Sequence, residues 1–463
     1  MHEADAAVAK TKGFAYCAIA AALIVYAVFV RQISARFEYA IDPLTYPIDS
    51  FVAAQFLAGC VFLTLLKVLP KLSASRHWWA VMLITGLTMR LLLVDTHPIL
   101  EVDFYRYLWD GGVLAHLNNP YAMPPDQIAS QAPPALHDLA ALSQPVHQRI
   151  NYPELRTIYP GVSQMGFALA HFIEPWSLDA WRAIIIAAEC LSLFLILRLL
   201  AQLGRSSLWA TLYWWNPLIA KELINSAHTE ALLVPALLGA ALLLVSQRRV
   251  LASTCLAIAT GVKLWPALLL PLVTRGMQIR ERAVLLAAGV FTGLCLLFLA
   301  PLGVSTLSYD SGLAQFATTW ERNSSFFGVT TSVLEAAGER AQQWLPRLLV
   351  AAMVCAVALH HWRRAQRDSA STTLIGAILW PATILFLLSP VQLPWYYAWF
   401  GACLCLLPSR GVLLLTPLLS LYYLQFYAKW HDWPTGYSTA IQVVQFTPVW
   451  CVLLWDHWRP RHA

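Results

Sequence analysis

The chain has 463 residues, of which 59% are hydrophobic and only 12% are charged. Soluble domains are about one-quarter charged, so this composition excludes a protein whose whole surface faces water and indicates that lipid surrounds much of the chain. The formal net charge of +6 is spread over short segments, which indicates membrane orientation rather than a nucleic-acid-binding surface. The nine cysteines form no Cys-x-x-Cys pair, so we expect small buried side chains rather than disulfides or a structural zinc site.

Long apolar segments recur along the chain, and a helix needs about 20 residues to cross the hydrocarbon core. The first segment, from Gly13 to about Val30, is too long for a signal-peptide core, so we interpret it as a retained span. We predict an all-α polytopic membrane protein with about 12 spans, within a range of about 10–13. The candidate spans are 13–32, 51–69, 78–95, 178–203, 207–221, 229–246, 284–301, 346–361, 372–389, 395–408, 411–427 and 438–455.

Lysine and arginine in short loops predict orientation, because such loops stay on the cytoplasmic side. With the N-terminus inside, strict alternation places both termini and every basic loop cluster inside. The long polar segments, about 97–157 and 302–345, then lie outside, and the first should contain juxtamembrane helices. Loops carry function more often than spans do, so we expect an external active face. The basic clusters lie near 67–76, 248–249, 275–282 and 363–367.

Two further apolar segments disturb this alternation. Residues 158–174 must start and finish outside, and residues 251–273 have arginines at both ends. We expect each to be re-entrant or broken, which is tolerated where protein or a water-filled cavity covers the backbone. The alternative is two ordinary crossings, which would put Arg248 and Arg249 outside and is therefore less favoured.

The segment from Glu101 to Asp110 follows the third span and is rich in charged and aromatic residues. As a helix it would present a polar face to a substrate at the membrane surface. An amphipathic helix held by an internal ion pair would have the same spacing, so both interpretations stay open. The polar face consists of Asp103, Arg106, Tyr107 and Asp110. The side chains predicted to dip toward lipid are Phe104, Leu108 and Trp109.

Three charged groups fall within predicted spans or apolar segments. Lys263 lies in an apolar segment beside Pro266, and an intramembrane lysine is costly enough that it usually faces a cavity. Arg90 is predicted to reach the outer interface with its long side chain. Glu189 needs a partner that the sequence does not identify.

Further polar motifs follow along the chain in an order that carries a family resemblance. Together with the segment after the third span, they resemble bacterial GT-C-type glycosyltransferases that use polyprenyl-phosphate sugars. The similarity spans roughly residues 85–400 and is strongest to the polyprenyl-phosphate-mannose-dependent mannosyltransferases. The motifs are Asn118-Asn119-Pro-Tyr121, Ile158-Tyr-Pro160, Trp215-Asn-Pro, Lys221-Glu, Asn225-Ser-Ala-His228-Thr-Glu230, Val262-Lys263-Leu-Trp-Pro266, Trp320-Glu-Arg322-Asn323 and Leu393-Pro-Trp395-Tyr396.

The resemblance implies a catalytic carboxylate in the first external loop, just after a span. Asp103 occupies that place and is favoured as the general base, with Glu101 as the alternative. Val102 interrupts the adjacent acidic residues that related sequences often have. Leu393 stands where the family often has histidine, and two extra spans precede the resembling part.

The implied reaction is inverting transfer of one sugar, mannose, from a polyprenyl-phosphate donor to a hydroxyl of a lipid-linked or cell-envelope acceptor. The departing lipid phosphate is anionic and needs positive charge or fixed dipoles. The sequence identifies no definite cofactor and leaves metal dependence open. His228 and Glu230 are candidates to bind a divalent cation or to position the acceptor; two ligands do not make a metal site, and a polar turn that connects helices is the favoured explanation. The predicted substrate-binding residues are Arg106, Tyr107, Asp110, Asn119, Tyr121, His228, Glu230, Lys263, Arg322, Asn323, Trp395 and Tyr396.

The sequence divides into an N-terminal pair of spans (1–77), a GT-C-like catalytic unit (78–455) and a cytoplasmic tail (456–463). The expected location is a bacterial inner membrane, with membrane lipid and glycan substrates as partners and no nucleic acid. A transporter or flippase for a lipid-linked sugar is one alternative, which predicts polar groups through the membrane midplane and internal repeats. An oligosaccharide ligase or polymerase is another, and a structural membrane subunit is a third.

Overall fold

The computed structural model describes residues 2–458 apart from 129–132, 277, 279, 336–337 and 435. Apart from two isolated β-bridges, this described part holds no strand, so the predicted all-α fold is confirmed. Among its helices, nine are long and apolar enough to cross a membrane, and three shorter apolar helices accompany them. The short ones are Glu230–Val245, Arg249–Thr260 and Trp265–Thr274.

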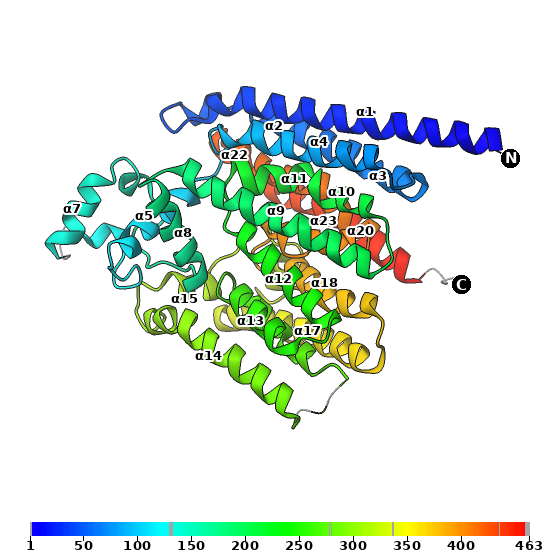
Figure 1. Ribbon diagram of the computed structural model, residues 1–463. Coiled ribbons are helices and arrows are strands. Elements are labelled where there is room, and N and C mark those ends of the chain that lie inside the picture. Colours follow the sequence, from blue (N-terminus) through cyan, green and yellow to red (C-terminus); the bar gives the residue numbers. More distant parts are fainter. Residues whose placement is uncertain are drawn as a thin grey trace.

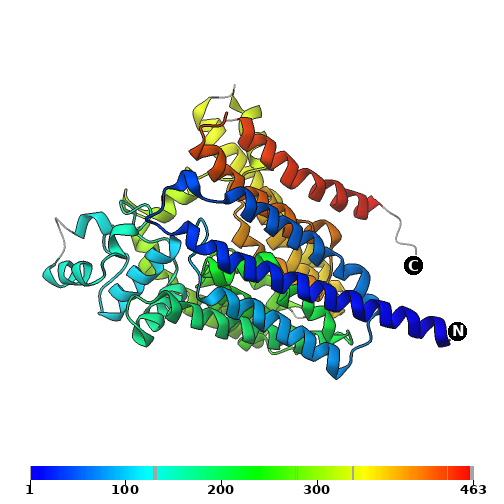
Figure 2. The same cartoon turned by 90° about the horizontal axis from the view of Figure 1, so that it is seen from above.

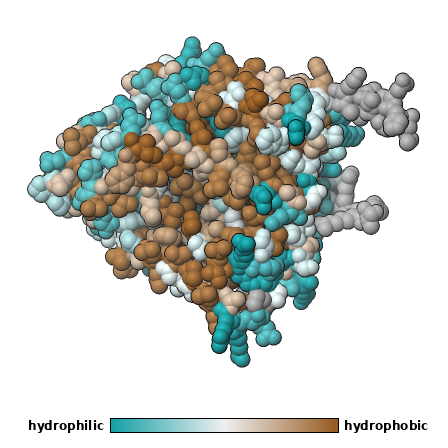
Figure 3. Space-filling view, viewed as in Figure 1, coloured by the Kyte–Doolittle hydropathy of each residue, from teal (hydrophilic) through white to brown (hydrophobic). Residues whose placement is uncertain are grey.

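The long helices run side by side, with both termini at one end of the bundle and α5, α7, α8 and α15 at the other (Figures 1 and 2). Apolar residues cover the middle of the face in Figure 3, and hydrophilic residues gather toward its two ends. This distribution is typical of a bundle with a lipid-facing belt. The longer helices are α1 (His2–Ser34), α2 (Ile48–Leu63), α4 (Arg76–Val94), α5 (Asp103–Ala115), α7 (Pro134–Leu142), α8 (Gly161–Ile173), α9 (Leu178–Gln202), α12 (Glu230–Val245), α13 (Arg249–Thr260), α14 (Arg282–Ser305), α15 (Gly312–Thr318), α16 (Phe326–Val333), α17 (Glu339–Arg367), α18 (Ser371–Leu388), α22 (Leu424–Trp430) and α23 (Gly436–Trp458).

Several parts of the bundle are broken into short helical pieces. Asn216 caps the piece that Pro217 begins, because its side chain accepts hydrogen bonds from the next two backbone N–H groups and proline cannot continue the preceding helix. Such breaks are tolerated where protein covers the backbone, and the pieces from 210 to 230 are buried. The pieces are α3 (Leu65–Val68), η6 (Ser207–Ala210), α10 (Thr211–Trp214), α11 (Pro217–Ile219), the π-helix η7 (Ala220–Asn225), η8 (Trp265–Thr274), η10 (Pro394–Tyr397), α19 (Ala398–Gly401), η11 (Ala402–Cys405), α20 (Arg410–Leu413), α21 (Leu415–Leu418) and η12 (Leu419–Tyr423).

The segment 251–273 turns back on itself. Arg249 Nη1 at the start of α13 donates to the carbonyl of Val273 at the end of η8, at 3.0 Å. The two ends of the segment therefore lie together, and Lys263 sits at the tip between α13 and η8. This is the geometry expected of a re-entrant hairpin.

The other segment that interrupts the predicted alternation of spans, 158–174, begins with extended backbone and continues as α8. α8 packs on α5 at the end of the bundle away from the termini (Figure 1). Gly111 makes this approach possible, because a Cβ at that position would lie 2.4 Å from the carbonyl oxygen of Phe167.

Arg90 does not reach the interface, so that prediction was wrong. Its guanidinium is fully buried and lies 2.6 Å from Glu189 Oε2, while Nη1 donates to the carbonyl of Trp214 at 2.7 Å. Tyr213 also donates to Glu189. The charge is satisfied inside the protein because α9 supplies a carboxylate that is remote in sequence and close in space.

The N-terminal helices pack onto the rest of the bundle. Tyr16 on α1 stacks on Trp215 with ring centroids 4.5 Å apart, and Phe51 on α2 meets the edge of Tyr423 at 5.4 Å. The segment 1–77 therefore supports elements far along the chain. Of the proposed tail, 456–458 belongs to α23, and 459–463 lie outside the described residues.

Breaking the Arg90–Glu189 pair should destabilise the bundle strongly. We expect Arg90→Leu to lower the free energy of unfolding by roughly 3–5 kcal/mol, because it leaves the buried carboxylate of Glu189 without its cation. The double variant Arg90→Leu, Glu189→Leu should lose less stability than the single variant, because it leaves no buried charge unpaired. The measurement is the apparent unfolding temperature in detergent. Arg31→Leu is the control, since Arg31 pairs with Asp95 at an exposed site. A double variant as unstable as the single one would contradict the pairing argument.

Candidate functional site

A cavity of about 520 Å³ is lined by residues of α5, α15 and the segments around them. Both helices lie at the end of the bundle away from the termini (Figure 1). The cavity lies between the start of α5, the extended segment 151–159, the hairpin tip at Lys263, the region 312–322, the start of η10 and the region 422–438. Segments from nearly the whole length of the chain therefore meet at one site. The cavity brings together these sequence-predicted residues: Glu101, Asp103, Arg106, Tyr107, Lys263, Arg322, Trp395 and Tyr396.

Asp103 is the first residue of α5 and faces this cavity. Its Oδ1 accepts a hydrogen bond of 2.7 Å from Asn151 Nδ2. Burial raises the pKa of Asp103, and the hydrogen bond from Asn151 and the charge of Lys263 oppose that rise. A helix N-terminus also favours negative charge. The side chain is therefore held in one orientation and can exchange a proton with a group in the cavity.

Glu101 has different surroundings, although it lies only two residues earlier. Its Oε1 accepts from the Tyr423 hydroxyl at 3.4 Å, and its Oε2 lies 3.7 Å from His228 Nε2. Burial raises the pKa of Glu101 well above its ordinary value; the charge of Lys221 opposes the rise, and Asp103 adds to it. Glu101 thus belongs to a buried cluster at the cavity wall, whereas Asp103 faces the open space.

Lys263 reaches the cavity from the hairpin tip. Its Nζ lies 2.9 Å from Glu230 Oε1, at the start of α12. The same ammonium lies 5.2 Å from the ring centroid of Tyr396 and 5.9 Å from that of Tyr159, which are favourable cation–π distances. Lys263 therefore lines the cavity, and its role there stays a prediction.

Arg322 also lines the cavity. Its backbone N–H donates to the carbonyl of Pro390 at 2.8 Å, and its carbonyl accepts from the N–H of Gln392 at 3.0 Å. These two hydrogen bonds form an isolated parallel β-bridge with Val391 and hold Arg322 beside the segment before η10. Its side chain is exposed. Within the described part of the chain, no carboxylate pairs with Arg322 or with Lys429, which also lines the cavity. Both cations are therefore available to an anionic ligand.

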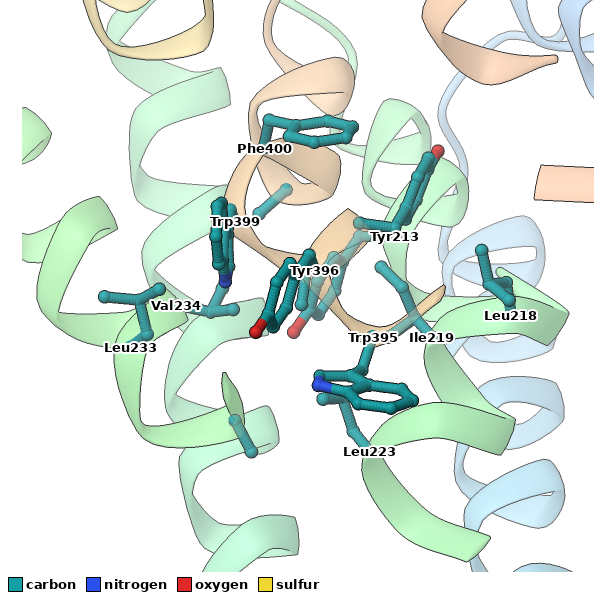
Figure 4. Close-up of a cluster of buried hydrophobic side chains, with 14 of the residues drawn as sticks. Tyr213, Leu218, Ile219, Leu223, Leu233, Val234, Trp395, Tyr396, Trp399 and Phe400 are labelled. Carbon is teal, nitrogen blue, oxygen red and sulfur yellow. The ribbon is translucent and has the colours of Figure 1, made fainter. Parts of the chain in front are cut away.

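Aromatic side chains form one wall. The ring of Trp395 stacks on His228 with centroids 4.0 Å apart, and Tyr396 stacks on Trp399 at 4.2 Å. Figure 4 shows Trp395, Tyr396 and Trp399 together among apolar side chains that include Ile219 and Leu223. The stacking holds flat faces at the cavity, where a sugar ring or a lipid could pack.

Six predicted binding residues do not line the cavity. Asp110 accepts from Arg106 at 3.0 Å and from Gln164 at 3.0 Å, so the ion-paired interpretation of this helix applies. Asn119 is exposed and forms a turn with the N–H of Tyr121, whose hydroxyl donates to a backbone carbonyl. Their role in substrate binding stays a prediction. The six are Asp110, Asn119, Tyr121, His228, Glu230 and Asn323.

Phe104, Leu108 and Trp109 are buried in protein, so the prediction that they dip toward lipid was wrong. Trp109 packs against His147 and Trp176, with centroids 4.6 and 6.3 Å away. Segments that follow α5 cover this face, which the helical spacing of α5 alone could not indicate.

His228 and Glu230 do not form a cation site together. Glu230 pairs with Lys263, whereas His228 faces Glu101 and Glu222. The peptide between them turns from the π-helix η7 into α12, so the two side chains point to different partners.

Sequence reasoning missed several side chains that shape the site. Asn151, which positions Asp103, lies in a proline-rich loop with no motif to single it out. Tyr423 lies within the predicted span 411–427 and Lys429 in the loop after it, so neither stands out in the sequence. Glu222 stands beside Lys221, and the spacing along the chain does not indicate that it approaches Glu101.

The profile of glycosyltransferase family 87 matches residues 158–390, just over half of the chain. The chain belongs to glycosyltransferase family 87. No curated protein and no solved structure matches it. In this family 87 glycosyltransferase, the matched region supplies Lys263, Arg322 and the hairpin, while Glu101 and Asp103 lie before it. The fold brings the two parts together in one cavity.

Loss of the Asn151 side chain should shift the pH dependence of transfer. Its hydrogen bond stabilises the charged form of Asp103, so Asn151→Leu should raise the pKa of Asp103 further. A base is inactive when protonated, so the acid limb of the pH–rate profile should move to higher pH. Asn118→Leu is the control, because that side chain only donates to the carbonyl of His116. An unmoved acid limb would show that Asn151 does not tune the base.

Proposed function

We propose that this family 87 glycosyltransferase transfers a single sugar, mannose, from a polyprenyl-phosphate donor to a hydroxyl of a lipid-linked or cell-envelope acceptor. The observation that carries the proposal is the position of Asp103. It faces a cavity that also contains unpaired cations and aromatic faces. Mannose and the polyprenyl-phosphate donor follow from the family resemblance of the sequence.

In the proposed reaction Asp103 is the general base. Its carboxylate takes the proton of the acceptor hydroxyl while the hydroxyl oxygen bonds to the anomeric carbon of the sugar. The bond between that carbon and the phosphate oxygen breaks, and its electron pair leaves with the lipid phosphate. A single displacement of this kind inverts the anomeric centre. Asn151 supports the role, since it holds the carboxylate of Asp103 at 2.7 Å.

The departing phosphate needs positive charge, and the cavity supplies it from two sides. Arg322 has a guanidinium that can bind phosphate in a bidentate manner. Lys263 carries a point charge and is held in place by Glu230. Trp395 and Tyr396 offer flat surfaces for the sugar or for the first isoprene units. These groups act best in a site from which water is excluded.

We place the cavity on the external side of a bacterial inner membrane. Arg249 and Arg275 lie at the other end of the bundle, where Arg275 donates to the carbonyl of Ala370 at 3.2 Å. Basic residues in short loops favour the cytoplasmic side. Both termini lie at that same end (Figures 1 and 2).

Replacing the proposed base should abolish transfer. We expect Asp103→Asn to lower the rate by about 10²–10⁴-fold, the usual contribution of a positioned base. Glu101→Gln should retain part of the activity. The assay uses membranes from a host lacking the protein, radiolabelled polyprenyl-phosphate mannose and extracted native acceptors, at equal protein levels.

If the Asp103→Asn variant transfers sugar as fast as the wild type, Asp103 is excluded as the base and Glu101 becomes the next candidate. No transfer by the wild type would exclude this donor, and transport of a lipid-linked sugar would then be tested.

Loss of the Arg322 charge should weaken donor binding. We expect Arg322→Gln to raise the donor KM by about tenfold or more, since a hydrogen bond to a charged group contributes roughly 1.5–3 kcal/mol. The side chain is exposed, so stability should change little. Arg280→Gln is the matched control, because it removes an exposed arginine from the opposite end. Equal KM values for the two variants would exclude Arg322 as a phosphate ligand.

A further inference from the structure

Three side chains with metal-ligating atoms converge beside the cavity, and one of them, Glu101, also lines it. Glu101 precedes α5, Glu222 lies in the π-helix η7, and His228 precedes α12. One ligand atom from each lies within 4.8 Å of the others, and all three residues are buried. The π-helix turn and the short loop after it bring two of the three into reach of the third.

His228 provides an independent sign of a missing ligand. Its ring is fully buried, and Nε2 has no hydrogen-bond partner. This nitrogen lies 3.7 Å from Glu101 Oε2 and 3.9 Å from Glu222 Oε2. Both distances are too long for hydrogen bonds. They are close to the separation of roughly 3.0–3.4 Å between adjacent ligands of one octahedral or tetrahedral ion with bonds of about 2.1 Å.

The ring of His228 is also held in position. Its other nitrogen, Nδ1, lies 3.4 Å from the hydroxyl of Tyr107, and the ring stacks on Trp395. A partner for the second nitrogen fixes which nitrogen can ligate a metal and how the ring is directed. Nε2 therefore points at the two carboxylates rather than into the open cavity.

The charges around this cluster leave room for a cation. Glu101 and Glu222 are two carboxylates that interact with each other, and Lys221 is the cation that acts on both. The neighbouring ion pair at the hairpin tip is neutral by itself. If both carboxylates are ionised, the excess charge of −1 is costly to bury without a further counter-charge.

We propose that Glu101, Glu222 and His228 bind one divalent first-row transition-metal cation of the Mn²⁺ class. One imidazole and two carboxylates suit such an ion, whereas magnesium and calcium prefer oxygen ligands throughout. Because Glu101 also lines the cavity, the ion can enter from there. The proposal concerns binding and goes beyond the proposed transfer reaction.

Lys221 should limit the affinity of this site. Its Nζ lies 3.3 Å from Glu222 Oε2, the same oxygen that faces His228. It also donates to the hydroxyl of Tyr423, which in turn donates to Glu222 Oε1 at 2.8 Å. A cation bound between the carboxylates would be repelled by this ammonium, so a neutral residue there should favour metal binding.

The test uses the 463-residue chain, purified in detergent without a histidine tag and stripped by chelation. Mn²⁺ is titrated in and free ion is followed by electron paramagnetic resonance, with no donor or acceptor present. We expect one Mn²⁺ per chain and a ¹⁴N coupling from His228 in the pulsed spectrum. His228→Phe, which keeps a stacked ring, and Glu222→Gln should each weaken binding by about tenfold or more, and Lys221→Met should strengthen it by about tenfold or more.

Asp110→Asn is the matched control, since it removes an equally buried carboxylate whose oxygens already accept hydrogen bonds from Arg106 and Gln164. It should leave Mn²⁺ binding unchanged. The proposal is overturned if the wild type binds no stoichiometric Mn²⁺ up to millimolar concentration, or if its bound Mn²⁺ shows no ¹⁴N coupling. These two results need no variant to fold. Either would leave the transfer reaction standing, because that is tested separately with Asp103→Asn.

Discussion

The pairing of buried charges is the constraint on which the rest of this structure depends. An ionised group inside an apolar bundle is costly unless an opposite charge and hydrogen bonds accompany it. Arg90 and Glu189 meet this requirement between α4 and α9, and Lys263 and Glu230 meet it between the hairpin tip and α12. The first pair joins helices that are distant in sequence, and the second joins the hairpin tip to the start of the helix before it, so the pairs help to specify which elements are neighbours.

The cavity is the place where this pairing is incomplete. Within the described chain, Asp103 forms no ion pair and is held by Asn151, while Arg322 faces the same space without a carboxylate. Groups that form no ion pair in this way are available to a ligand. The same site therefore combines a base and a cation without letting them neutralise each other.

Breaks in the helices position these groups. A continuous helix would carry its side chains past the cavity at regular intervals of 3.6 residues. Asn216 and Pro217 interrupt one segment, the turn at Lys263 interrupts another, and Pro394 begins a third. The N-terminal helices support these segments, because Phe51 on α2 packs against Tyr423. Membership of family 87 rests on residues 158–390, yet the carboxylates come from the segment before that region.

The sequence by itself determined the membrane environment, the all-α fold and the segments that meet at the site. Composition and long apolar runs suffice for the first two, because burying backbone in lipid leaves helices as the simplest solution. The motifs that contain Asp103, Lys263 and Trp395 indicated which segments meet at the site. Tertiary structure decided the partners: Arg90 with Glu189, Glu230 with Lys263, and His228 with Glu101 and Glu222. Local spacing could not predict these contacts, since each depends on how separate helices pack and on which charge must be neutralised inside the bundle.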